Sequence, residues 1–173
     1  MNFWTIFKTN KDKSDQHHQM TSSLQKKIST LLNGMPDDEL IKIACIAGLS
    51  ARVVGSDMVI EDGEIQSMKE ALKKWGELPA QKADAAVQLA MEDSKELAGI
   101  ENHKYCSPLI DLMTADERYH LLESLFAIAA GDGSVVNAES EEIRLISKGL
   151  MLGHNHFVSA RATVLQHLES LKK

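Results

Sequence analysis

The sequence is poor in cysteine, proline and aromatic residues: it holds two cysteines, three prolines and 5% aromatic side chains among 173 residues. Two thiols are too few for the disulfide framework of a small secreted protein, so we expect reduced cysteines in a soluble cytoplasmic protein. Cys45 lies in the apolar run 43–47, which predicts a buried and inert thiol. The long segments are filled by Ala, Leu, Lys, Glu, Met and Gln, a composition that favours helix throughout.

Long apolar runs and an excess of positive charge are also missing. The best candidate for a membrane span, residues 40–54, is interrupted by Lys42 and Arg52, so no spanning helix is predicted. The first eight residues are too short for a signal-peptide core and are expected to stay attached. The net charge of −6 argues against nucleic-acid binding, because phosphate contacts need a concentrated positive face.

Residues 1–21 differ in composition from the rest of the chain. Residues 9–21 are polar without an apolar period, which predicts a flexible linker, and the helical domain is expected over 22–173. An aromatic cluster precedes the linker and comprises Phe3, Trp4, Ile6 and Phe7. One interpretation folds this cluster back onto the domain. The other makes it a docking element for a protein partner or, in peripheral contact, for the headgroup region of a membrane.

Glycine and proline separate the helix-forming segments, and no segment alternates with the two-residue period of a strand. We therefore predict an all-α, compact bundle of about seven helices. The expected segments run from Ser22 or Ser23 to Gly34 and then over 36–55, 63–76, 79–98, 107–113, 114–130, 138–152 and 155–171. The second should be the central helix, capped by Asp37, because residues 43–49 are apolar almost all round. Thr114 and Glu117 have the spacing of a reciprocal N-terminal cap.

An internal repeat is the strongest pattern in the sequence. Two stretches separated by 75 residues, from position 57 to position 132, preserve chemical type. The matched pairs are Asp57 with Asp132, Ile60 with Val135, Asp62 with Asn137, Glu64 with Glu139 and Met68 with Ile143. Each copy follows a helix rich in apolar and small residues, so each unit is predicted to be a helix, an acidic loop and a second helix. Two such units packed together would form a pseudo-symmetric core.

The second loop, Ala-Gly-Asp-Gly-Ser-Val-Val-Asn-Ala-Glu over residues 130–139, contains an Asp-Gly, then an aliphatic residue, then a Glu seven positions after the Asp. This resembles the signature of the TerB (tellurite-resistance protein B) family, which carries the loop twice. The resemblance covers roughly residues 37–170, and the first copy departs from it at Met58, where glycine is expected. It implies an all-helical fold, a cytoplasmic bacterial setting, a link to tellurite or envelope stress, acidic loops suspected of binding metal, and no established enzymatic activity.

The acidic loops supply oxygen atoms suited to Ca²⁺ or Mg²⁺. The candidate ligands are Asp57, Asp62 and Glu64 in the first copy and Asp132, Asn137 and Glu139 in the second. The alternative is that these side chains only cap the following helices and stabilise their positive ends. An EF-hand is excluded, because its twelfth loop position needs an acidic ligand and Met68 and Ile143 stand there.

Histidines offer the remaining chemistry. His154 and His156 precede the last predicted helix, and His120 stands three residues before Glu123. A solvated helix start and a surface pair are the commoner outcomes for such residues. The chain also lacks a dinucleotide loop, a phosphate loop and a nucleophile elbow. We therefore predict that the protein is not an enzyme.

These observations lead to one principal prediction and two alternatives. The principal one is a TerB-like non-enzymatic binding or sensing module in a bacterial tellurite or envelope stress response, which binds a divalent cation or a protein partner through its acidic loops. The second is a protein-interaction adaptor with purely structural loops, similar to the TerB-like regions attached to J-domain co-chaperones. The third is an enzyme built on His120 or on the His154–His156 pair.

Overall fold

A computed structural model of the chain describes residues 22–96 and 102–171. It contains the helices α2 (Ser23–Leu31), α3 (Asp37–Val54), α4 (Asp62–Gly76), α5 (Ala80–Glu96), α6 (His103–Leu112), α7 (Ala115–Ala129), α8 (Asn137–Gly149) and α9 (His154–Ala162). Short 3₁₀ turns follow α7 and α9: η1 (Ala130–Asp132), η2 (Leu165–His167) and η3 (Glu169–Leu171). Within the described ranges no strand occurs, and a single parallel bridge joins Val135 to Leu168. The all-α prediction is confirmed.

The first 21 residues lie outside the described part of the chain. The predictions for the linker and for the aromatic docking cluster Phe3, Trp4, Ile6 and Phe7 fall there. None of the described helices is both long enough and apolar enough to cross a membrane.

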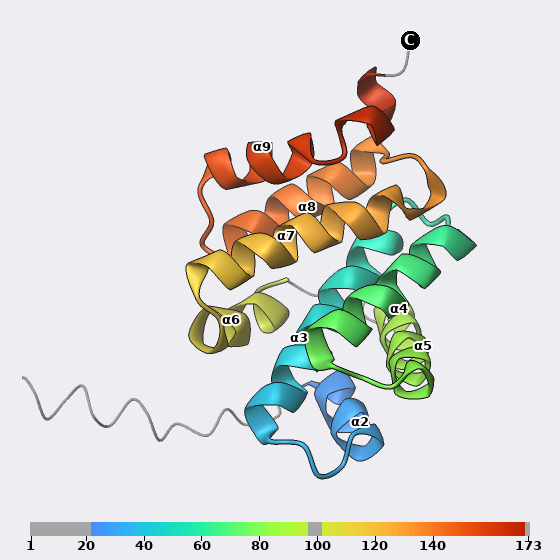
Figure 1. Cartoon of the computed structure of the whole chain (residues 1–173), viewed down its shortest axis with the longest axis vertical. Coiled ribbons are helices and arrows are strands. Elements are labelled where there is room, and N and C mark those ends of the chain that lie inside the picture. Colours follow the sequence, from blue (N-terminus) through green and yellow to red (C-terminus); the bar gives the residue numbers. More distant parts are fainter. Residues whose placement is uncertain (1–21, 97–101, 172–173) are drawn as a thin grey trace, which may run out of the picture.

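Helix α3 is the centre of the bundle, as its apolar sequence predicts. It contacts α2 and every helix from α4 to α8 (Figure 1). Most of its side chains are buried, including Cys45, and burial raises the pKa of that thiol to about 12. Close packing needs small residues here: a Cβ added to Gly48 would stand 2.6 Å from the ring of Tyr105. Cys45 is therefore a protonated core residue, as predicted.

The predicted reciprocal cap at Thr114 is confirmed, and the predicted cap at Asp37 is wrong. Ser22, where a helix was expected to start, forms a reciprocal cap of the same kind with Gln25. Asp37, however, is the first residue of α3 and not its cap. Pro36 takes the cap position with an extended backbone at φ −59° and ψ 144°, because its ring fixes φ at a value suited to a helix start.

Two helix boundaries also differ from prediction. Helix α6 begins at His103, four residues earlier than expected, with Pro108 inside it. Pro108 has no amide hydrogen, so the helical hydrogen bond to the carbonyl four residues earlier is missing at this position. The predicted helix over 155–171 ends at Ala162. The 3₁₀ turns that follow bring the chain back to Val135, which donates to the His167 carbonyl at 2.7 Å and accepts from the Glu169 amide at 3.1 Å.

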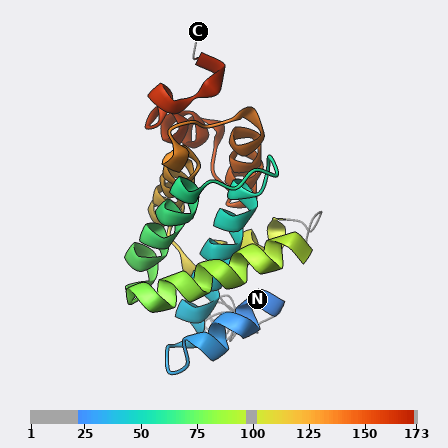
Figure 2. The same ribbon diagram turned by 90° about the vertical axis from the view of Figure 1, so that its right-hand side faces the viewer.

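The two predicted hairpins are present and packed together. The first is α3, a loop over residues 55–61 and α4; the second is α7, a loop over 130–136 that includes η1, and α8. Helix α4 packs against α7 and η1, and α3 packs against α7 and α8. Both loops therefore lie at the same end of the paired hairpins (Figures 1 and 2).

Candidate functional site

The first turn of α4 and the second acidic loop meet through backbone at a pair of glycines. A Cβ added to Gly63 would overlap the carbonyl oxygen of Gly131, and one added to Gly131 would stand 2.5 Å from the carbonyl oxygen of Gly63. Real Cβ atoms do not approach so closely, and neither neighbour is a flexible side chain that could give way. Any residue larger than glycine would force α4 and the second loop apart. The repeat pattern did not reveal this contact, because Gly63 and Gly131 are not equivalent positions of the two copies.

The aspartates at the start of the loops form the same tight turn in both copies. Asp57 accepts a hydrogen bond from the Val59 amide at 2.9 Å, and Asp132 accepts one from the Ser134 amide at 2.7 Å. The residue after each aspartate has a left-handed backbone, with φ 66° at Met58 and 92° at Gly133. The first loop therefore keeps the geometry of the second although methionine replaces the expected glycine.

Two glutamates close the loops from the first turn of the following helices. Glu64 accepts a hydrogen bond from the Glu61 amide and Glu139 accepts one from the Val136 amide, each at 2.9 Å. Both side chains are buried, with 4% and 3% of their surface exposed. These glutamates satisfy the free backbone donor at the start of each helix.

The same two glutamates share a hydrogen bond with each other. The pKa of Glu139 is raised to about 9, mainly by burial and then by the hydrogen bond with Glu64; the hydrogen bond from the Val136 amide opposes the rise, and the charges of Glu64 and Asp57 add to it. Burial also raises the pKa of Glu64; hydrogen bonds from Glu139 and the Glu61 amide oppose the rise, and the charges of Asp132 and Asp57 add to it. Two buried carboxyls in contact cannot both ionise at low cost, so the pair holds a proton.

The structure thus brings two of the six predicted oxygen ligands, Glu64 and Glu139, into contact, and two others, Asp57 and Asp132, near enough for their charges to act on Glu64. We call Asp57, Glu64, Asp132 and Glu139 the carboxyl cluster. The group mixes the two copies, since the charges of Asp57 and Asp132 both act on Glu64. Asp62 and Asn137, the other two predicted ligands, are the first residues of α4 and α8 and their side chains are exposed.

The chemistry of the cluster suits a hard cation, because carboxylate oxygen is the preferred ligand of Ca²⁺ and Mg²⁺. Its present arrangement is that of a protonated pair: over residues 22–96 and 102–171, no three Asp, Glu, His or Cys side chains are already placed to hold a metal ion. A cation would have to displace the shared proton and draw the carboxylates together.

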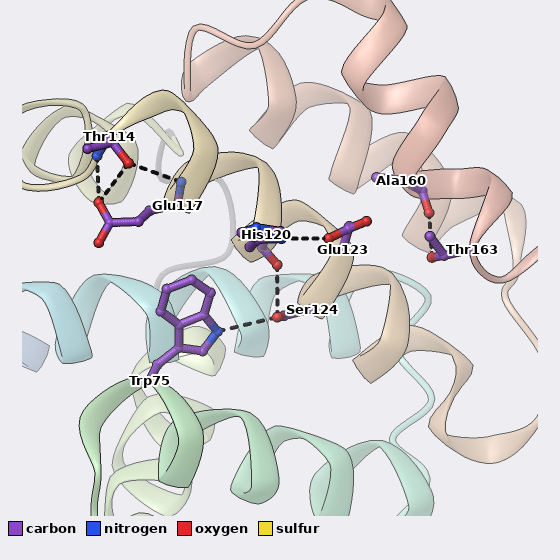
Figure 3. A network of polar contacts seen from close by, with 8 residues as sticks. All are labelled: Trp75, Thr114, Glu117, His120, Glu123, Ser124, Ala160 and Thr163. Carbon is purple, nitrogen blue, oxygen red and sulfur yellow. Dashed lines mark hydrogen bonds and ion pairs between the residues drawn. The ribbon is translucent and has the colours of Figure 1, made fainter.

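Of the predicted histidine candidates, His120 and His154 are exposed and His156 is half-buried. His120 Nδ1 lies 2.9 Å from Glu123 Oε2, and the His120 side chain is 66% exposed (Figure 3). The ring of His156 packs at 5.6 Å from that of Tyr119, and the ring of His154 stacks on Phe157. His120 therefore forms a surface pair with Glu123, and His154 and His156 lie in the first turn of α9. These are the two arrangements that the sequence analysis gave as the commoner outcomes.

Comparison with known proteins covers most of the chain. Residues 42–162 match the family model described as tellurite resistance protein TerB. A search of curated proteins and a search of solved structures each find no match. The matched range contains both acidic loops, the glycine contact and the whole carboxyl cluster.

Proposed function

The chain belongs to the tellurite resistance protein TerB family, and from this membership and the carboxyl cluster we propose that it is a non-enzymatic module that binds a divalent cation between its two acidic loops. The observation that carries the proposal is the contact between two buried carboxyls, Glu64 and Glu139, one from each repeated unit, with the charges of Asp57 and Asp132 acting on Glu64. The proposal includes a cytoplasmic role in a bacterial response to tellurite or envelope stress.

The physical argument rests on the repulsion inside the cluster. The Glu64 and Glu139 carboxyls are in contact, and the charges of Asp57 and Asp132 add to the repulsion at Glu64, of which a shared proton offsets only part. A bound Ca²⁺ or Mg²⁺ would supply two positive charges at the same place. Asp57, Glu64, Asp132 and Glu139 are the residues that would hold it, and the oxygen-only donor set favours these hard cations over a thiolate-seeking metal.

Thermal unfolding of the full chain tests the proposal. A ligand specific to the native state stabilises it by mass action, by about 2.7 kcal/mol at one hundred times the dissociation constant. We expect CaCl₂ or MgCl₂, added after treatment with EDTA, to raise the melting temperature with saturation. The gain should disappear in Asp132→Asn.

The control is Asp116→Asn, which changes an aspartate in the first turn of α7, at the far end of that helix from the second loop. This variant should keep the full gain in melting temperature. A melting temperature that does not respond to either cation, or a response that survives Asp132→Asn, would overturn the proposal.

The second candidate is a protein-interaction adaptor whose loops are purely structural. It is favoured by the hydrogen bonds that already engage each of the four carboxyls, two in tight turns and two at helix starts. In this case neither cation would change the melting temperature. Asp132→Ala would lower it in the absence of any cation, since the Ser134 amide loses its acceptor in the turn, whereas Asp132→Asn keeps an acceptor oxygen and would change it little.

A further inference from the structure

An apolar groove lies beside the first acidic loop, and neither Glu64 nor Glu139 lines it. It has a volume of about 530 Å³ and is formed by the end of α3, the first loop, Ser94 of α5 and one face of α8. Its apolar lining includes Ala51, Met58, Ile60, Ala138 and Leu145. Among these, Ile60 is 44% exposed and Leu145 48% exposed, so the groove presents large apolar side chains to solvent.

Met58 shows most clearly that this surface is unusual. Its side chain is 94% exposed, and its backbone has φ 66°. A left-handed backbone costs roughly 1–2 kcal/mol for a residue with a Cβ, and the equivalent position in the second loop is Gly133, which avoids the cost. The first loop therefore accepts strain in order to present a flexible apolar side chain at the mouth of the groove.

The border of the groove carries two carboxylates and one guanidinium. Glu141 and Glu142 of α8 line it together with Arg52, which is ion-paired with Glu142 at 3.0 Å. Glu141 is exposed and is ion-paired with Arg144 at 2.8 Å. An apolar floor with carboxylates at its edge suits a short segment that carries large apolar side chains next to lysines.

The chain itself contains a segment of this composition. Residues 2–13 read Asn-Phe-Trp-Thr-Ile-Phe-Lys-Thr-Asn-Lys-Asp-Lys, four large apolar side chains followed by three lysines. Helix α2 begins at Ser23, which leaves residues 8–22 as the connection. At roughly 3.3 Å per residue these can span about 50 Å, whereas a domain of this size has a radius of gyration of about 15 Å. The segment is long enough to reach the groove.

We propose that this groove is the binding site of the chain's own N-terminal segment. Phe3, Trp4, Ile6 and Phe7 occupy the apolar floor beside Met58 and Leu145, and the lysines that follow face Glu141 and Glu142. Docking of the N-terminal segment would cover both the apolar groove and the aromatic cluster in a single contact. It is independent of cation binding at the carboxyl cluster.

Tryptophan fluorescence of the full chain provides the test. Trp4 and Trp75 are the only tryptophans. Trp75 is half-buried and donates to the Ser124 hydroxyl at 3.3 Å (Figure 3), so Trp75→Phe keeps the ring packing and leaves Trp4 as the single reporter. We expect blue-shifted Trp4 emission with low accessibility to acrylamide. Adding Met58→Asp or Leu145→Asp should shift the emission to that of an exposed indole.

Two further variants separate docking from folding. Val158→Asp changes a side chain of α9 that is 49% exposed and lies outside the groove lining, and it should leave Trp4 emission unchanged. Met58→Gly removes the side chain and also relieves the left-handed strain, so the domain stays folded while Trp4 becomes more accessible to acrylamide.

Three results would overturn the proposal. Trp4 emission typical of an exposed indole in the Trp75→Phe protein would show that the segment does not dock. Blue-shifted emission that persists in Met58→Asp and Leu145→Asp would place the segment elsewhere. Blue-shifted emission that is lost on dilution would show that the groove binds a second copy of the chain.

Discussion

At the scale of single residues, Glu64 and Glu139 each perform two tasks. Each accepts a hydrogen bond from the backbone at a helix start, and the two carboxyls face one another across the two loops. The capping role could be expected from sequence, because glutamate three residues after a helix start is a common cap. The shared proton could not be expected from sequence, because the two glutamates are 75 positions apart in the chain.

The raised pKa of Glu139 predicts how stability depends on pH. The pKa rises from 4.5 to about 9 on folding, so between these values the native state binds a proton that the unfolded state does not. The contribution of this group to stability is therefore fully present below pH 4.5 and is lost as the pH rises toward 9. In EDTA, we expect the free energy of unfolding to fall more steeply between pH 5 and 9 in the native sequence than in Glu139→Gln.

Urea denaturation at several pH values measures this difference. Glu77→Gln, which replaces an exposed glutamate at the opposite end of α4, should keep the steep dependence. Equal slopes for the native sequence and Glu139→Gln would show that the pair carries no extra proton.

The glycine contact predicts a second effect at single positions. Gly63→Ala or Gly131→Ala should destabilise the domain by about 1–3 kcal/mol, because each forces backbone atoms apart in a packed site. Gly55→Ala is the matched control: its Cβ would stand 3.2 Å from one carbonyl of its own helix, and its φ is −87°. Chemical denaturation that finds all three variants alike would contradict the close approach of α4 and the second loop.

At the scale of helices, the cap of α7 was predicted correctly, whereas the cap of α3 and two helix boundaries were not. Thr114 and Glu117 form the reciprocal cap that their spacing indicates, because both partners lie in one turn and need no distant residue (Figure 3). The start of α6 and the end of α9 were wrong, because a proline in the first turns is tolerated and because the end of α9 is decided by a contact with the second loop.

The cap of α7 can be tested directly. Thr114→Ala should lower the free energy of unfolding by about 1 kcal/mol, since the Glu117 amide loses its acceptor. Thr114→Ser keeps the hydroxyl and should remain close to the native stability. Thermal denaturation that ranks serine with alanine would show that the methyl group of Thr114, and not the cap, stabilises the helix.

At the scale of the whole molecule, the chain after α9 closes the bundle over the second loop. Leu168 is 1% exposed although it lies between two 3₁₀ turns, and its neighbours on either side hydrogen-bond to Val135. The residues that end the domain therefore support the loop that carries Asp132 and Glu139. Periodicity alone could not show this, because the segment also has the composition of a continuing helix.

This arrangement predicts that truncating Leu168, which is far along the chain from most of the core residues, lowers the stability of the domain strongly. Leu168→Ala should destabilise the domain by about 2–5 kcal/mol, the usual cost of truncating a buried leucine. Leu165→Ala, at a position 54% exposed, should change stability little. Guanidinium denaturation tests both, and a Leu168→Ala protein as stable as Leu165→Ala would show that the tail does not pack on the core.

The sequence by itself determined the helical class, the central helix, the two repeated hairpins and the family, because each depends on patterns within about twenty neighbouring residues or on a motif. It also named all four members of the carboxyl cluster among six candidates. Only the tertiary structure decided that Glu64 and Glu139 meet, that Asp62 and Asn137 point to solvent, and that Met58 stands beside an open groove. These facts depend on how two hairpins pack, and packing joins residues whose separation in the chain carries no local signal.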